Sequence, residues 1–145
     1  MNNEKLDYIK NKYPEAIFPA PFARMFNMNF TKLESGSVHA EVIVDKAWTN
    51  PFGIAHGGFL FSMLDEVLGS SACSVLDKPV YDDVKALSTT NHDIFFHSPA
   101  KPGDKLIIKA HVLSCRKNML FVEGHIEQED KTLVAESKGI WFIKR

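Results

Sequence analysis

The stretch GGFLFSMLDEVLGSSACSVL, residues 57–76, decides the fold of this 145-residue chain. It is long, apolar and free of proline, so it predicts a helix of about five turns. Its apolar residues cover most of the circumference, which indicates a helix buried inside the protein. One narrow polar stripe interrupts them at intervals of three and four residues. It consists of Ser62, Asp65, Glu66, Gly69 and Ser70.

Strand signals lie on both sides of this helix. Upstream, residues 25–33 and 37–45 alternate apolar and polar side chains around a turn at residues 34–37, which predicts a hairpin. One long helix between runs of antiparallel strands predicts an α+β domain whose curved sheet wraps around the helix. The downstream strands are predicted at residues 85–97, 105–115, 119–128 and 132–143, with turns at 98–104 and 129–131.

The sequence indicates one domain over residues 1–145, with a helical extension at about residues 1–22. Within the extension, residues 4–13 place apolar side chains at helical spacing, and Pro14 ends this predicted helix. A chain of this length buries a sizeable core without disulfides or metal ions.

The composition limits which binding partners and which cellular location we expect for this protein. The formal net charge is -1, from 17 Lys plus Arg and 18 Asp plus Glu, which gives no electrostatic case for nucleic acid or an anionic membrane. The N-terminus lacks the apolar core of a signal peptide, and no stretch reaches the roughly 18 apolar residues of a membrane span. Cys73 and Cys115 match no C-x-x-C pattern and are interpreted as reduced. These features predict a soluble cytoplasmic protein.

The strongest sign of chemistry is the run NPFGIAHGG, residues 50–58, followed after six residues by Asp65. Gly57 and Gly58 stand where the long helix begins, and a helix start presents unpaired N–H groups with partial positive charge. Such donors stabilise a carbonyl oxygen that becomes anionic during acyl transfer. The alternative is that glycines are simply common at helix ends and that His56 caps the helix.

Asp65 is a carboxylate in the middle of an apolar helix. Burying it is costly unless it faces a hydrated cleft or a partner group. The alternative is that the whole polar stripe faces solvent. Either way, the polar side chains of this helix lie on one side.

The predicted strand at residues 85–97 does not alternate as a strand packed on one face should. Its segment LSTTNHD, residues 87–93, is polar on both faces. This indicates a strand that lines a hydrated cleft, or else an edge strand. In a cleft, Ser88, Thr89 and Asn91 are candidates to orient a water molecule.

No metal, nucleotide or serine-nucleophile motif is present. The sequence contains neither H-E-x-x-H, nor the phosphate-binding G-x-x-x-x-G-K-[ST], nor the G-x-S-x-G elbow. We therefore expect no metal and no cofactor. The histidines outside the motif are interpreted as surface or core residues: His39, His92, His97, His111 and His125.

The combined pattern N-x-x-G-x-x-H-G-G-x6-D at the start of a buried helix resembles the phenylacetic-acid-degradation type of hotdog thioesterases. The turn SPA at residues 98–100 and PGD at residues 102–104 extend the resemblance, which runs from about residue 29 to the end. It implies a hotdog fold, a curved antiparallel sheet wrapped around one central helix. It also implies assembly into dimers and often tetramers, and hydrolysis of acyl-coenzyme A.

The resemblance also implies roles for individual residues. The Gly57 N–H would donate to the thioester carbonyl, beside Gly58, and His56 and Asn50 would shape that end of the site. Asp65 would be the general base or the nucleophile. A hydroxyl residue on the following strand would help to place water. Thr89 matches this position best, with Ser88 as the alternative.

Glu66 departs from the family pattern, which usually has a neutral residue after the aspartate. Two adjacent carboxylates would raise each other's pKa, or Glu66 itself would be the catalytic group. Its place on the stripe is more typical of a solvated or interface residue than of a second catalytic group, and we include it among the candidate substrate-binding residues.

The spacing of Gly57 and Asp65 predicts that one copy of the chain is not enough. Eight residues along a helix correspond to about 12 Å. Both groups must lie within about 3 Å of one reacting centre. If both act on one thioester, the second group comes from another copy, so we expect an obligate homodimer, with a dimer of dimers as the larger form.

Three functions compete. The first is an acyl-CoA thioesterase, and the second is a non-catalytic acyl-CoA-binding protein. A hotdog dehydratase or hydratase is disfavoured because the sequence shows no histidine and carboxylate pair arranged for that chemistry. Four basic residues are candidates to bind the nucleotide of coenzyme A: Lys101, Lys105, Arg116 and Lys117. Four phenylalanines could line an acyl pocket or could simply belong to the core: Phe59, Phe61, Phe95 and Phe96.

Overall fold

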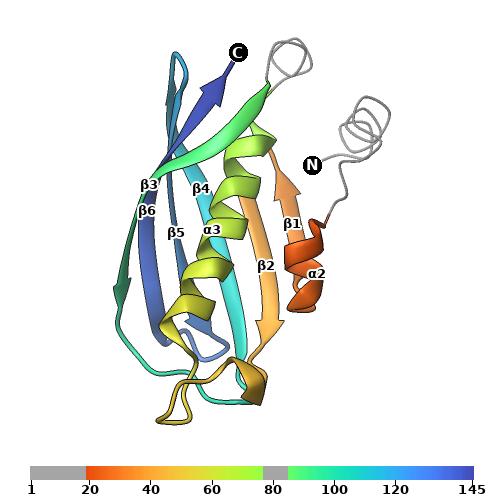
Figure 1. Cartoon of the computed structure of the whole chain (residues 1–145), viewed down its shortest axis with the longest axis vertical. Coiled ribbons are helices and arrows are strands. Elements are labelled where there is room, and N and C mark those ends of the chain that lie inside the picture. The colour runs from red at the N-terminus through yellow and green to blue at the C-terminus, as the bar shows by residue number, and fades with distance from the viewer. Residues whose placement is uncertain (1–18, 77–84) are drawn as a thin grey trace.

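A single six-stranded antiparallel sheet dominates the computed structural model, which describes residues 19–76 and 85–145 (Figure 1). The strands follow the order β1-β2-β4-β5-β6-β3, so β1 and β3 form the two edges. The bounds are β1 Asn29–Glu34, β2 Ser37–Ile43, β3 Ala86–Phe96, β4 Lys105–Arg116, β5 Met119–Gln128 and β6 Leu133–Lys144.

The long helix α3, Gly57–Ser74, lies across one face of this sheet, and the sheet curves around it (Figure 1). Its sheet-facing side is buried, whereas the polar stripe from Ser62 to Ser70 is only partly buried. This confirms the α+β class and the hotdog arrangement. The polar side chains of the stripe lie on the side of α3 that faces away from the sheet. The buried residues of α3 are Phe59, Leu60, Met63, Leu64, Val67, Leu68, Ser71, Ala72 and Ser74.

Two buried serines near the end of α3 fasten the helix to the β1–β2 turn. The Ser71 hydroxyl donates to the Gly36 carbonyl at 3.1 Å, and the Gly36 N–H donates to Ser74 Oγ at 2.7 Å. Gly36 has a φ of +76°, a conformation that side chains disfavour. These bonds satisfy polar groups that packing would otherwise leave unpaired.

Three aromatic rings fix the opposite end of α3. The Trp48 ring stacks on Phe59 at a centroid distance of 5.0 Å, and Phe26 meets both rings at 5.0 and 5.5 Å. Trp48 belongs to the short 3-10 helix η1, Lys46–Trp48. Phe59 is therefore part of the core rather than of an acyl pocket, and the cluster holds the start of α3 against the preceding loop.

The predicted elements agree with the structure within two residues, except near the N-terminus. The first hairpin strand was predicted from residue 25, but β1 begins at Asn29. Residues Pro21–Met25 form the short helix α2 instead, with proline in its first turn, where a helix needs no N–H donor. The helix predicted over residues 4–13 lies outside the described residues. Among the helices of the described ranges, none has the length and apolarity that crossing a membrane requires.

A β-bulge in the edge strand β3 explains its irregular polarity. Thr89 pairs with Trp141 and Asn91 pairs with Ile140, so Thr90 is an extra residue on β3. Alternation is shifted by one residue beyond this point. Thr89 and His92, three residues apart, consequently point to the same face of the sheet, the face that packs against α3.

Candidate active site

The loop before α3 is folded by the side chain of Asn50. Its Oδ1 accepts hydrogen bonds from the Phe52 N–H at 2.9 Å and the Ile54 N–H at 3.4 Å. Gly53, inside this turn, has a φ of +73°. Asn50 and Gly53 thus have a local structural role, because they form the turn that leads into the helix.

His56 caps α3 and decides which glycine N–H stays available. The His56 Nδ1 accepts from the Gly58 N–H at 2.9 Å. Among the hydrogen bonds of residues 19–76 and 85–145, none uses the Gly57 N–H. As the first residue of the helix, Gly57 has no intrahelical acceptor for it. His56 therefore caps the helix, which was the alternative interpretation of the motif, and the Gly57 N–H, unlike the Gly58 N–H, has no acceptor among the described residues.

Gly57 lies in close contact with the end of β3. A Cβ at this position would lie 3.3 Å from Cζ of Phe96, so any side chain would have to displace that ring. Phe96 is 54% exposed. A cavity of about 390 Å³ opens here, and it is lined by Asn50, Ile54, Ala55, Gly57, Leu60, Phe96, His97, Ser98, Pro99 and Ala100.

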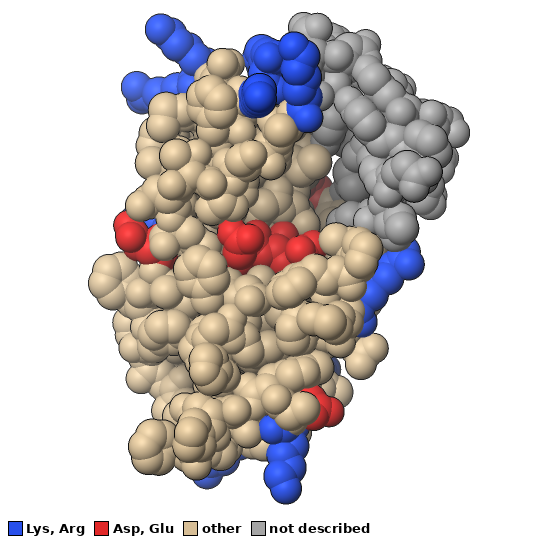
Figure 2. All heavy atoms as spheres, viewed as in Figure 1, with Lys and Arg blue, Asp and Glu red and all other residues tan. Residues whose placement is uncertain are grey.

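Asp65 lies about two turns further along α3 than Gly57, on its partly exposed stripe. Acidic side chains occupy the middle of the α3 face of the molecule (Figure 2), and Asp65 and Glu66 are the only acidic residues of this helix. The Asp65 side chain is 43% exposed. Its Oδ1 accepts from the Thr89 hydroxyl at 3.1 Å and lies 3.4 Å from Nδ1 of His92.

The pKa values of the two adjacent carboxylates, Asp65 and Glu66, are shifted in opposite directions. The contact with His92, and then the hydrogen bond from Thr89, hold the pKa of Asp65 below its usual range, against the effect of burial. Burial, and then the Asp65 charge, raise the pKa of Glu66. Glu66 makes no hydrogen bond or ion pair within the described parts of the chain. Asp65 is therefore the more readily ionised of the two carboxylates, and the two pKa values do not both rise.

Ser88 and Asn91 lie away from Asp65. Ser88 pairs with Phe142, whose side chain is exposed on the outer face of the sheet, and Asn91 pairs with Ile140 on that same face. Of the three residues predicted to orient water, the structure thus brings only Thr89 to the carboxylate. The choice between Thr89 and Ser88 falls on Thr89 because the two residues point in opposite directions.

His92 was missed as a site residue. It was interpreted as an ordinary surface or core histidine, and a histidine–carboxylate pair was considered absent. The burial of the ring agrees with a core histidine, whereas its approach to Asp65 at 3.4 Å contradicts that ground for disfavouring a dehydratase. The polarity on both faces of residues 87–93 was the one available signal. Among the described residues, no group of three or more His, Cys, Asp or Glu side chains has the arrangement of a metal site.

One copy of the chain does not bring Gly57 and Asp65 together. Both lie on the uninterrupted helix α3, eight positions apart, which corresponds to about 12 Å. The Gly57 N–H and the Asp65 carboxylate are therefore separated on one subunit.

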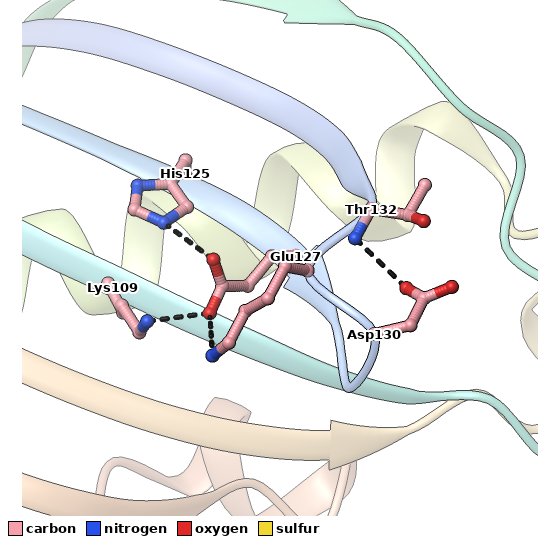
Figure 3. Close-up of polar contacts among 6 residues, drawn as sticks. Lys109, His125, Glu127, Asp130 and Thr132 are labelled. Atoms are coloured by element: carbon pink, nitrogen blue, oxygen red, sulfur yellow. Dashed lines mark hydrogen bonds and ion pairs between the residues drawn. The ribbon is translucent and has the colours of Figure 1, made fainter.

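A second polar cluster lies on the outer face of the sheet (Figure 3). Glu127 Oε1 accepts from Lys109 Nζ at 2.6 Å and from Lys131 Nζ at 3.0 Å, and His125 Nε2 lies 3.4 Å from Oε2. The two lysines lower the pKa of Glu127 to about 2. A cavity of about 540 Å³ lies beside it, larger than the one at Gly57 but remote from Asp65. The sequence analysis did not single out this cluster.

Comparison with known proteins identifies the family. A family model described as the thioesterase superfamily matches residues 52–135. A protein of Saccharolobus solfataricus, provisionally named as an esterase, is 31% identical over 118 residues, which are 81% of this chain and 74% of that protein. The chain therefore belongs to the thioesterase superfamily.

Two further relatives are informative. The chain is 30% identical to human acyl-coenzyme A thioesterase 13 over 87 residues, which are 59% of this chain and 57% of that protein. Its fold is similar to that of the PaaI protein from the phenylacetic acid degradation operon of E. coli, with a TM-score of 0.73, 22% identity, and coverage of 83% of this chain and 86% of that one. The resemblance found in the sequence is confirmed at the level of family and fold.

Proposed function

We propose that this chain hydrolyses the thioester of an acyl-coenzyme A and releases the free acid and coenzyme A. One observation carries the proposal: the Asp65 carboxylate is anchored through Oδ1, and no hydrogen bond or ion pair among the described residues involves Oδ2. An ionised carboxylate on a half-exposed helix face, with one oxygen that no described residue binds, is available for chemistry. Membership of the thioesterase superfamily supports the reaction, and the name of the human relative supports the substrate class.

In the proposed reaction, Asp65 Oδ2 takes a proton from water while that water attacks the carbonyl carbon of the thioester. The Gly57 N–H donates to the oxyanion that forms, and the intermediate expels the thiolate of coenzyme A. Direct attack by Asp65 is the other route, through an acyl anhydride that water then opens. Rapid quenching followed by mass spectrometry separates the routes, because only the second adds the acyl group to Asp65.

The active form in this proposal is a homodimer in which Gly57 of one copy meets Asp65 of the other. The separation along α3 supports it, as does the open edge of β3. Phe95 and Phe96, at the end of this edge strand, are 63% and 54% exposed. Large exposed apolar side chains next to an unpaired strand edge are typical of an interface. Light scattering distinguishes the dimer from the proposed dimer of dimers.

Mixing two inactive variants tests the shared site. We expect Gly57→Val and Asp65→Asn each to be inactive alone, since each damages both sites of its own homodimer. After subunit exchange, half of the dimers are mixed and carry one intact site, so about a quarter of the wild-type activity returns. No recovery, with exchange verified by native mass spectrometry, would show that each site is built within one copy.

The direct test of function is release of free thiol from short-chain, long-chain and aromatic acyl-CoA substrates. Turnover that depends on Asp65 supports hydrolysis, whereas tight binding without thiol release would mean a non-catalytic acyl-CoA-binding protein. The cavity beside Gly57 and Phe96 is the proposed acyl end of the site. We also propose a cytoplasmic location.

A further inference from the structure

The His92 side chain is buried without hydrogen-bond partners. It is 3% exposed, and neither ring nitrogen makes a hydrogen bond within the described residues. A buried polar group left unpaired destabilises the fold, so each such case in a protein needs an explanation. An apolar side chain of similar size would fill the same space without this cost. The imidazole is therefore in need of a partner that packing alone does not supply.

The surroundings of His92 hold the ring in a fixed place. The ring lies against Phe61 at a centroid distance of 4.4 Å and against Trp141 at 5.8 Å. The residue paired with His92 across the sheet is Gly139, and a Cβ there would lie 2.5 Å from the Trp141 ring. Because Gly139 has no side chain, the Trp141 ring has space to lie beside His92.

The group nearest to the ring nitrogens is the Asp65 carboxylate. Nδ1 of His92 lies 3.4 Å from Oδ1 of Asp65, and Thr89 donates to the same oxygen at 3.1 Å. The distance to Nδ1 is longer than a well-formed hydrogen bond, and a small shift of the carboxylate would close it. Both Thr89 and His92 contact Oδ1, and no hydrogen bond or ion pair among the described residues involves Oδ2.

We infer that His92 is a positioning residue for Asp65: its Nδ1–H, together with the Thr89 hydroxyl, fixes Oδ1 so that Oδ2 is directed at the reacting carbonyl or its water. The inference rests on the proposed role of Asp65. Apo sites often show such bonds long and poorly aligned, and they tighten when substrate binds. The bulge at Thr90 supports it further, because it aims both Thr89 and His92 at the same carboxylate.

Neither donor is a lysine or an arginine, so a hydroxyl and an imidazole orient the carboxylate. A salt bridge to lysine or arginine would hold the Asp65 carboxylate as firmly but would offset its negative charge. The contact with His92 is also the largest influence that keeps the pKa of Asp65 low. Glu66 is the other titratable group on this part of α3.

Two substitutions of His92 separate positioning from packing. His92→Phe keeps a ring between Phe61 and Trp141 but removes the donor, whereas His92→Asn keeps a donor near the Nδ1 position but loses the ring. If His92 positions Asp65, His92→Phe lowers kcat roughly tenfold to a hundredfold with little change in KM. His92→Asn then retains more activity than His92→Phe, although it melts at a lower temperature.

The dependence of kcat/KM on pH gives a second readout. His92→Phe is expected to move the acid limb to higher pH, since it removes the contact that lowers the pKa of Asp65, and His92→Asn is expected to move it less. The profiles are repeated in a Glu66→Gln background so that titration of Glu66 does not contribute. His111→Phe is the matched control: it removes another histidine near a carboxylate, Glu123 at 3.0 Å, on the outer face, and should change neither quantity.

The outcomes are distinct. Activity that follows stability, with Phe as good as or better than wild type and Asn worst, would overturn the inference and make His92 a packing residue. So would an unchanged acid limb in His92→Phe. If Asp65→Asn itself keeps full activity, the proposed role of Asp65 fails and the inference fails with it. If Asp65→Asn is inactive while His92→Phe is fully active, only the role of His92 is wrong.

Discussion

Two carboxylates with lowered pKa values lie on opposite sides of the same sheet, and their surroundings differ in kind. Glu127, on the outer face, accepts from two lysines, and its second oxygen faces His125. Asp65, on the α3 side, accepts a hydrogen bond from the Thr89 hydroxyl and lies close to the His92 imidazole. Both groups contact the same oxygen, Oδ1.

The comparison shows that a lowered pKa does not by itself mark a catalytic group. Glu127 is ionised because two lysines bind one of its oxygens, and His125 lies 3.4 Å from the other. Asp65 is ionised while its Oδ2 has no hydrogen bond or ion pair among the described residues. The surroundings of the two oxygens, rather than the direction of the pKa shift, thus separate Glu127 from the carboxylate that we propose as the catalytic one.

The strongest test of this difference is activity. Asp65→Asn should lower kcat by about 10²- to 10⁴-fold with little effect on folding, because the side chains are nearly isosteric. Glu127→Gln should leave kcat close to wild type. Steady-state thioesterase kinetics and circular dichroism of both variants provide the measurement. The assignment of Asp65 fails if Glu66→Gln proves inactive and Asp65→Asn active.

Stability should show the reverse order. Glu127→Gln removes the anion between Lys109 and Lys131 and is expected to reduce the free energy of unfolding by roughly 1–2 kcal/mol. Asp65→Asn should cost less, because its carboxylate is half-exposed and has no cationic partner of that kind. Urea denaturation of the two variants measures both values. Equal losses would mean that the two carboxylates do not differ as described.

A smaller effect is expected from Thr89→Val, which keeps the shape of the side chain and removes its hydrogen bond to Oδ1. We predict a fall in kcat of about fivefold. Ser88→Ala, on the opposite face of β3, should lose much less. Parallel assays of the two variants decide between them, and a larger loss in Ser88→Ala would reverse the assignment of the hydroxyl residue.

Acid conditions should reduce the contribution of Glu127 gradually. Its pKa is lowered from 4.5 to about 2 in the folded chain, so its stabilisation is present above the unfolded value and is lost as pH falls through the folded one. The difference in melting temperature between wild type and Glu127→Gln should thus be constant above pH 4.5 and shrink from there toward pH 2. A difference that stays constant across this range would contradict the lysine pairing.

The regular parts of the fold follow from local patterns, and so does the motif. The helix at residues 57–76 and the downstream strands have strong, uninterrupted periodicity, and their bounds were predicted within two residues. Asn50, Gly53 and His56 act within their own loop, so their positions could be inferred from a contiguous stretch. Residues 21–25 were missed because one turn of helix is too short to show a period.

The partners of Asp65 could not be predicted in the same way. Thr89 and His92 are three residues apart, and regular alternation would place them on opposite faces. Only the pairing with β6 reveals that Thr90 is an extra residue. The role of His92 depends on this register and on the space that Gly139 leaves for Trp141, and neither can be read from a single strand.

The extra residue Thr90 has a consequence for tracing this arrangement through other sequences. A strand without it would carry the same two aimed side chains two positions apart, and a strand with it carries them three apart. Pattern searches that fix one interval would overlook chains that use the other interval to present a hydroxyl and an imidazole to a helical aspartate. Allowing a one-residue gap at this point recovers both forms.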